Sequence, residues 1–174
     1  MRATLLAAAF ALGLAGCKYF KDAPEVVDPP AGTAVIAQLD RGACFGPCPV
    51  YSLTVFADGT VIYDGTTHVK VTGRRSRVLK PPQLDQLVAS FERHGFAGMA
   101  ASYEKTDAED PPTISLTYRG KIVNRAPGDP RTPPALLAIE DELEHLTGAE
   151  EWTGIDSKIR KREEKERYEK AKRF

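Results

Sequence analysis

Residues 51–63, YSLTVFADGTVIY, restrict the possible folds more than any other segment of the chain. Aromatic and β-branched residues dominate both halves, as is typical of strands. Asp58-Gly59 separates the halves, and this dipeptide is typical of a type I′ turn, which needs a positive φ at both central residues. The segment therefore predicts an antiparallel hairpin in which Val55 faces Ile62. In that register Tyr51, Leu53, Val55 and Ile62 share one face, and Thr54, Phe56, Val61 and Tyr63 share the other.

Three further segments have the composition of strands. The run TAVIAQL at 33–39 and the run THVKVTG at 67–73 each predict one strand. The segment TISLTYRGKIVNRA, at 113–126, predicts a second hairpin whose turn is Arg119-Gly120. An antiparallel sheet built from hairpins is therefore expected.

Two amphipathic helices are predicted from apolar residues at helical spacing. The first covers 81–96, and Gly95 suits the left-handed position after its last turn, which lets Phe96 pack back on Phe91. The second is expected to begin with Thr132 as its N-cap and to end at Gly148. The buried stripes are predicted to be Leu84, Leu87, Val88 and Phe91 in the first helix, and Leu136, Ile139, Leu143 and Leu146 in the second.

These elements predict an α+β domain over residues 33–150, with the two helices packed on one face of the antiparallel sheet. Residues 151–174 are predicted to form a charged helical tail. From Asp156 to Phe174 the chain carries nine Lys or Arg and five Asp or Glu. The full chain has a formal charge of zero, so its balance does not favour nucleic acid as a partner.

The first 17 residues, MRATLLAAAFALGLAGC, predict export and a lipid anchor. Their apolar stretch is shorter than the roughly 20 residues that span a bilayer. It ends in a segment, LAGC, that resembles the lipobox of bacterial lipoproteins. The resemblance implies that residues 1–16 are a signal peptide and that Cys17 carries acyl chains such as palmitate. Residues 17–32 are expected to be a flexible tether. Lys18 is not the aspartate that retains such proteins in the inner membrane, so the outer membrane, facing the periplasm, is the expected location.

Cys44 and Cys48 lie in the segment RGACFGPCPVY. Disulfides persist outside the cytoplasm, and acylation of Cys17 leaves these two cysteines as an even pair. We therefore expect a structural disulfide, with Gly46 and Pro47 permitting the sharp turn.

Two other roles for this pair stay open. The spacing C-x-x-x-C-P resembles the thiolate clamp of membrane-anchored copper chaperones, and two thiolates with a histidine suit Cu(I). His68 is the best candidate for that histidine, because His94 is expected at a helix end and His145 on a helix surface. The second role is thiol redox exchange, which requires a thiolate of low pKa.

The same segment resembles the opening of a bacterial domain of unknown function. That domain occurs in secreted and lipid-anchored proteins and begins with C-x-G-x-C-P-x-Y followed by a hairpin. The resemblance covers about residues 33–126 and implies an envelope module without an assigned activity. It is carried by Arg41-Gly42, Cys44, Gly46, Cys48-Pro49, Tyr51, Asp58-Gly59, Tyr63 and Gly65.

Other polar groups are interpreted without a catalytic role. An acidic loop could bind a hard cation but matches no calcium loop; it contains Asp107, Glu109 and Asp110. Three arginines could bind phosphate or form a polar strand edge; they are Arg74, Arg75 and Arg77. Three aspartates are expected in turns; they are Asp58, Asp64 and Asp129.

No serine lies in a nucleophile-elbow segment, so no catalytic residue, cofactor or enzymatic activity is predicted. The sequence instead favours a membrane-anchored envelope lipoprotein whose domain binds or scaffolds an envelope protein or the cell wall. The alternative function is copper binding or thiol redox chemistry in the periplasm, using Cys44 and Cys48.

Overall fold

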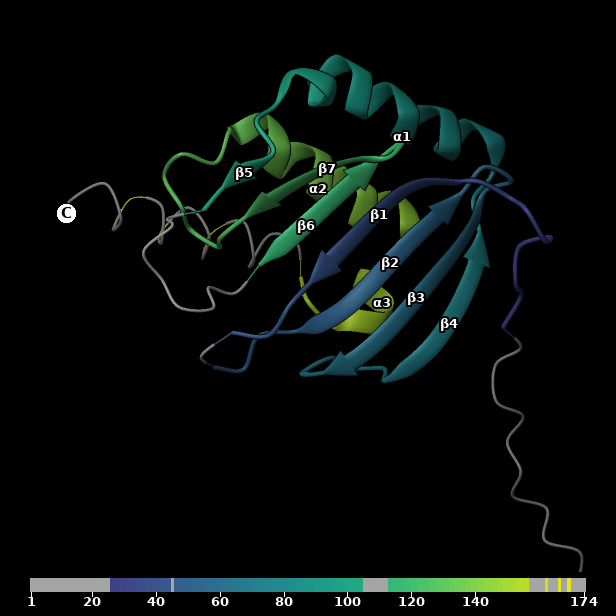
Figure 1. Ribbon diagram of the computed structural model, residues 1–174. Coiled ribbons are helices and arrows are strands. Elements are labelled where there is room, and N and C mark those ends of the chain that lie inside the picture. Colours follow the sequence, from purple (N-terminus) through teal and green to yellow (C-terminus); the bar gives the residue numbers. More distant parts are fainter. Residues whose placement is uncertain are drawn as a thin grey trace, which may run out of the picture.

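The computed structural model describes residues 26–44, 46–104 and 113–156, together with Arg162, Glu166 and Glu169. Within this part of the chain, seven strands form one sheet in the order β4-β3-β2-β1-β6-β7-β5 (Figure 1). All neighbouring strands are antiparallel except β5 and β7. The strands are β1 (Val35–Arg41), β2 (Val50–Phe56), β3 (Thr60–Thr67), β4 (Gly73–Val78), β5 (Ser102–Tyr103), β6 (Ile114–Tyr118) and β7 (Lys121–Arg125).

The helices pack on one face of this sheet, which confirms the predicted α+β fold (Figure 1). They are α1 (Pro81–Arg93), the 3-10 turn η1 (Phe96–Gly98), α2 (Pro134–Thr147) and the short C-terminal α3 (Glu150–Thr153). The strands present alternate residues to the helices, and this covered face holds the core, with Leu39, Leu53, Val61 and Leu116 almost fully buried.

The hairpin β2–β3 forms where the sequence predicts it, but its register is shifted by one residue. Val55 pairs with Val61, and Thr54 pairs with Ile62. The reason lies in the turn: Gly59 has a φ of 88°, whereas Asp58 does not have a positive φ. The Asp58 carboxylate instead accepts hydrogen bonds from the backbone and the hydroxyl of Thr60.

The turn therefore contains three residues rather than two, and a one-residue slip exchanges the two faces of a strand. The predicted faces were wrong for β3. Val61 and Tyr63 share the covered face with Tyr51, Leu53 and Val55, whereas Ile62 lies on the opposite face with Thr54.

The second hairpin, β6–β7, has the predicted turn. Arg119 and Gly120 have φ values of 46° and 82°, and Tyr118 pairs with Lys121 across them. The strand predicted at 67–73 was wrong, because residues 68–72 turn the chain between β3 and β4. The arginines that follow lie in β4, which confirms the polar edge strand. Asp64 lies in strand β3, paired with Ser52 and Arg74, and not in a turn as predicted.

Both helices end at the predicted glycines. Gly95 and Gly148 each have a φ of 65°, and the Phe91 and Phe96 rings meet edge to face with centroids 5.2 Å apart. The start of α2 was predicted wrongly: Pro133, not Thr132, occupies the N-cap, and no side chain caps the helix. Proline has a backbone φ that suits this position even without a capping side chain.

The ends of the chain lie largely outside the described residues. This applies to the predicted signal peptide, to Cys17 and to most of the tether and the charged tail. Beyond α3, the described Arg162, Glu166 and Glu169 are helical. Among the described residues, no helix combines the length and the apolar character that crossing a bilayer would require.

Candidate functional site

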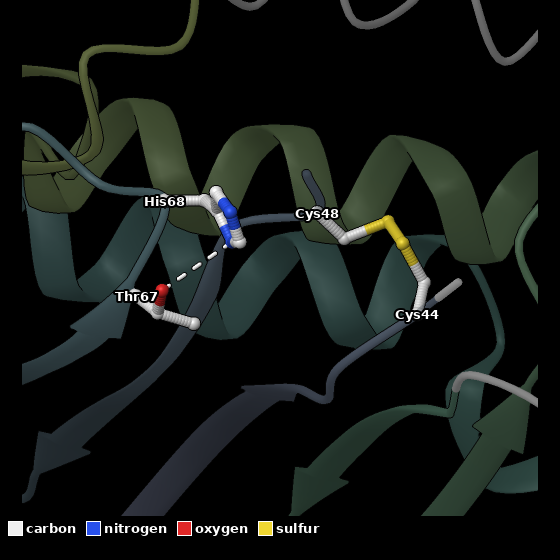
Figure 2. Close-up of a disulfide and its surroundings, with 4 residues drawn as sticks. All are labelled: Cys44, Cys48, Thr67 and His68. Carbon is white, nitrogen blue, oxygen red and sulfur yellow. Dashed lines mark hydrogen bonds between the residues drawn. A yellow bond between two sulfur atoms is a disulfide. The ribbon is translucent and has the colours of Figure 1, made fainter. Parts of the chain in front are cut away.

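The disulfide loop, residues 42–49 between β1 and β2, contains the predicted Cys44–Cys48 bond (Figure 2). The two Cα atoms lie 5.7 Å apart, within the usual range for a disulfide. Two tight backbone hydrogen bonds shape the loop, from Gly46 N to Cys44 O at 2.8 Å and from Cys48 N to Gly46 O at 2.9 Å. Gly46 and Pro47 are exposed and the cysteines are half-buried, so the bond between the two predicted cysteines lies in a loop that solvent can reach; its structural role stays a prediction.

His68 lies at the same end of the sheet as this loop. Thr67 pairs with Val50, so the residue after Thr67 comes next to the residues that precede Val50 (Figure 2). His68 is exposed, and its Nδ1 lies 3.4 Å from the Thr67 hydroxyl. Within the described ranges, no group of three or more His, Cys, Asp or Glu side chains has the arrangement of a metal site. In the disulfide form, neither cysteine offers a thiolate.

The other two histidines lie where the sequence predicts them. His94 is the C-cap of α1, and His145 is exposed on α2. The acidic residues Asp107, Glu109 and Asp110 lie outside the described residues.

Beneath the disulfide loop lies a buried ionic cluster, which consists of Arg41, Tyr51, Arg125, Glu140 and Glu144. Arg125 donates from Nε and Nη2 to the two carboxylate oxygens of Glu140, both at 2.6 Å. Arg41 donates from Nη2 to Glu140 at 3.3 Å and from Nε to Glu144 at 2.9 Å. The Tyr51 hydroxyl accepts from Arg41 Nε at 3.0 Å and donates to Glu144.

The register of four strands brings this cluster together. Arg41 pairs with Tyr51 on one side and with Ile114 on the other, and Ile114 pairs with Arg125. These residues form one row across β2, β1, β6 and β7 on the covered face. Helix α2 lies over that row, and its Glu140 and Glu144 are one turn apart on the same side of the helix.

Burial makes the pairing in this cluster obligatory. The Arg125 and Glu140 side chains are only 1% and 2% exposed. Removing an ion from water costs several kcal/mol, which is offset only where partners and geometry are good. The bidentate Arg125–Glu140 contact has that geometry. Two arginines and two glutamates also give the cluster a formal charge of zero.

The cluster holds both strand ends that flank the disulfide loop, which are called its stems below. Arg41 ends β1 three residues before Cys44, and Tyr51 lies three residues after Cys48. Both stems are therefore fixed to α2 through Glu144. The candidate functional site is thus a small cross-linked loop held on a rigid ionic base.

Sequence reasoning missed this cluster, although a signal for it is present. Arg41 continues the buried alternation of Ala37 and Leu39, and Arg125 continues that of Val123. Likewise Glu140 lies four residues after the buried Leu136. Charged residues in phase with a buried stripe indicate a buried ion pair, but their partners cannot be assigned before the strands are ordered.

A protein-family model described as a domain of unknown function, DUF6438, matches residues 36–147. The chain belongs to that family. The matched range contains both cysteines of the disulfide loop and all five residues of the ionic cluster, so the candidate site is part of the DUF6438 domain. The comparisons with curated proteins and with solved structures gave no significant match. The resemblance to an uncharacterised domain is confirmed, whereas the lipid anchor and the short cysteine motif stay predictions.

Proposed function

We propose that this protein is a bacterial envelope lipoprotein. Residues 1–16 direct export, acylated Cys17 anchors the chain, and the domain faces the periplasm from the outer membrane. The observation that supports this most directly is the Cys44–Cys48 disulfide in a loop open to solvent. Such a bond is reduced in the cytoplasm and persists in an oxidising compartment. The lipobox-like LAGC segment gives the same location from independent residues.

We further propose that the DUF6438 domain binds or scaffolds a partner in the envelope, and does not act as an enzyme. The helices lie on only one face of the sheet (Figure 1). The opposite face presents short polar side chains in rows across four adjacent strands, and such hydroxyl and amide groups can hydrogen-bond an envelope protein or a cell-wall polymer. These residues are Gln38, Asp40, Ser52, Thr54, Ser115, Thr117 and Asn124.

The anchor is tested by expressing the full chain in a bacterial host supplied with labelled palmitate. We expect label in the wild type and none in C17S. The mass of the purified protein should fit a chain that begins at acylated Cys17. An unmodified chain that still contains residues 1–16, or a cleaved chain without acyl groups, would refute the lipoprotein proposal.

The binding role is tested by photo-cross-linking in the same cells. The open face is the face of the sheet that the helices leave uncovered. A photoreactive residue at Thr54 or Thr117 on this face should give a discrete cross-linked product that mass spectrometry identifies. The same residue at Ala89, which is exposed on α1, is the matched control. Equal products from both faces, or none from the open face, would contradict a partner on the sheet.

Copper binding or thiol redox chemistry is the second candidate, and one observation favours it. The β2–β3 register brings His68 beside the strand that follows Cys48. Mass spectrometry of protein purified from a copper-supplied periplasm separates the candidates. A denatured mass two hydrogens below the dithiol form, without metal in the native spectrum, supports the disulfide. One copper bound to the reduced form, and lost in C44S/C48S, would establish the metal site instead.

A further inference from the structure

Edge strand β4 and its flanking residues concentrate positive charge. From Gly65 to Leu84 the chain contains no Asp or Glu. It contains five Lys or Arg residues. One lies in the turn before β4, three lie in β4, and one directly precedes α1. All five are exposed or half-buried. This surface, called the basic edge below, consists of Lys70, Arg74, Arg75, Arg77 and Lys80.

The first described residues of the chain, from 26 onward, lie beside the basic edge (Figure 1). The backbone N–H of Val27 donates to the Ser76 hydroxyl at 2.6 Å, and Asp28 pairs with Arg74 at 2.6 Å. Nine residues separate Cys17 from Val27, and the ten residue-to-residue steps span at most about 35 Å when the chain is extended. Acylation of Cys17 would therefore hold β4 within that distance of the bilayer.

The C-terminal end of the domain is fixed to the same edge. The N–H groups of Lys70 and Val71 donate to the carbonyls of Thr153 and Trp152, at 3.1 and 2.8 Å. Arg77 lies over the Trp152 ring, 4.2 Å from its centroid. Arg77 also pairs with Glu151 at 2.7 Å, and this contact lowers the pKa of the Glu151 carboxyl. The basic segment that starts at Asp156 thus begins a few residues from the edge.

The remaining charge is strongly asymmetric. Three acids lie against the basic edge, because Asp28 and Glu151 pair with its arginines and Asp64 lies opposite Arg74, so the net charge there is 5 − 3 = +2. The rest of residues 17–155 carries nine Lys or Arg against 19 − 3 = 16 Asp or Glu. The tail from Asp156 onward adds a net charge of +4. An anionic surface would therefore attract the edge and the tail and repel the rest of the domain. These electrostatic forces act over roughly the Debye length of 8–10 Å.

Resting on the proposed anchoring at Cys17, we infer that the basic edge faces the membrane that holds Cys17 and binds the anionic headgroups of its phospholipids. Guanidinium groups suit phosphate oxygens. Half of the Arg74 side chain stays exposed despite its contact with Asp28. The tether keeps the edge at high effective concentration near the bilayer, so individually weak contacts suffice. Each arginine near such a surface strengthens binding by about fivefold.

The first test uses the mature chain, residues 17–174, with C17S to remove the anchor, purified from a periplasm so that the disulfide forms. The probe is vesicles of phosphatidylglycerol and phosphatidylcholine, with phosphatidylcholine alone as the neutral comparison. We expect sedimentation with the anionic vesicles only, and loss at high salt. R74Q/R75Q should weaken binding by about 25-fold. R93Q/R119Q removes the same charge from two exposed arginines off the edge and should bind like the parent chain.

Four results of these binding assays would overturn the inference. They are equal binding to neutral vesicles, unchanged binding of R74Q/R75Q, equal weakening of R93Q/R119Q, and binding to isolated cell-wall material but not to vesicles. A chain that ends at Asp156 separates the edge from the tail. Its residual binding should still depend on Arg74 and Arg75. Thermal melting of each variant confirms that it is folded.

The acylated protein supplies a second readout, because Trp152 is the only tryptophan of the chain and lies against β4. In vesicles that contain phosphatidylglycerol spin-labelled at the headgroup, Trp152 fluorescence should be quenched, and R74Q/R75Q should relieve the quenching. Unquenched wild-type Trp152 would place the edge away from the membrane. Failure of acylation at Cys17 would refute the proposed function separately, because the vesicle sedimentation needs no anchor.

Discussion

The substitution Glu140→Gln tests the buried ionic cluster directly. Glutamine keeps the volume but removes the charge and replaces one acceptor oxygen with an NH2 donor, so the guanidinium of Arg125, 1% exposed, loses its counter-ion and at least one of its two 2.6 Å contacts. Arg41 loses its contact with the same carboxylate. Breaking a buried pair on one side costs about 3–5 kcal/mol, because the other charge stays buried. That is a large part of the roughly 5–15 kcal/mol that stabilises a domain.

The assay is equilibrium unfolding in urea, followed by circular dichroism, on the disulfide-bonded protein. We expect E140Q to lower the free energy of unfolding by about 3–5 kcal/mol. The matched control is R119Q, which breaks the exposed Arg119–Glu92 pair, where both side chains are about 60% exposed. Such surface pairs contribute about 0–1 kcal/mol.

A double substitution distinguishes pairing from shape. R125M/E140L removes both charges and keeps apolar volume, so it should destabilise the protein less than E140Q alone. If the free energy of unfolding of E140Q lies within about 1 kcal/mol of the wild-type value, the buried charges do not compensate each other and the ionic cluster does not stabilise the fold as argued.

Three further outcomes are expected. Replacing both disulfide cysteines with serine should cost about 2 kcal/mol in urea unfolding, and a reductant should destabilise the wild type equally but leave the double variant unchanged. G59A should cost about 2–4 kcal/mol, because a Cβ there would lie 2.8 Å from the backbone carbonyl oxygen of Leu79, whereas G95A, also at a positive φ but beside open space, should cost about 1 kcal/mol; equal losses would contradict the overlap. Burial raises the pKa of Tyr63 to about 12, above its usual value of 10, so the folded state holds this proton more tightly and loses stability as pH rises from about 10 to 12. In Y63F the free energy of unfolding should fall less over this pH range. A titration followed by tyrosinate absorbance should show one fewer tyrosine that ionises above the usual pH.

The elements that local chemistry controls were predictable from sequence. The Arg119-Gly120 turn, the helix ends at Gly95 and Gly148, and the Cys44–Cys48 bond each depend on residues within one turn of the chain. The α+β class followed from the order of these elements. The local predictions failed where two turn geometries compete, as at Asp58-Gly59, or where proline replaces a capping side chain, as at Pro133.

The sequence by itself determined which segments become strands and helices and which loop is cross-linked, because backbone preferences and short-range contacts act over a few residues. Only the tertiary structure decided that Arg41 meets Glu140 and Glu144, about a hundred residues away, and that both ends of the domain lie on β4. Those contacts depend on strand order and register, which are selected by the packing of the whole core. The same charged residues would be solvated if the sheet were ordered differently, so no local pattern could assign their partners.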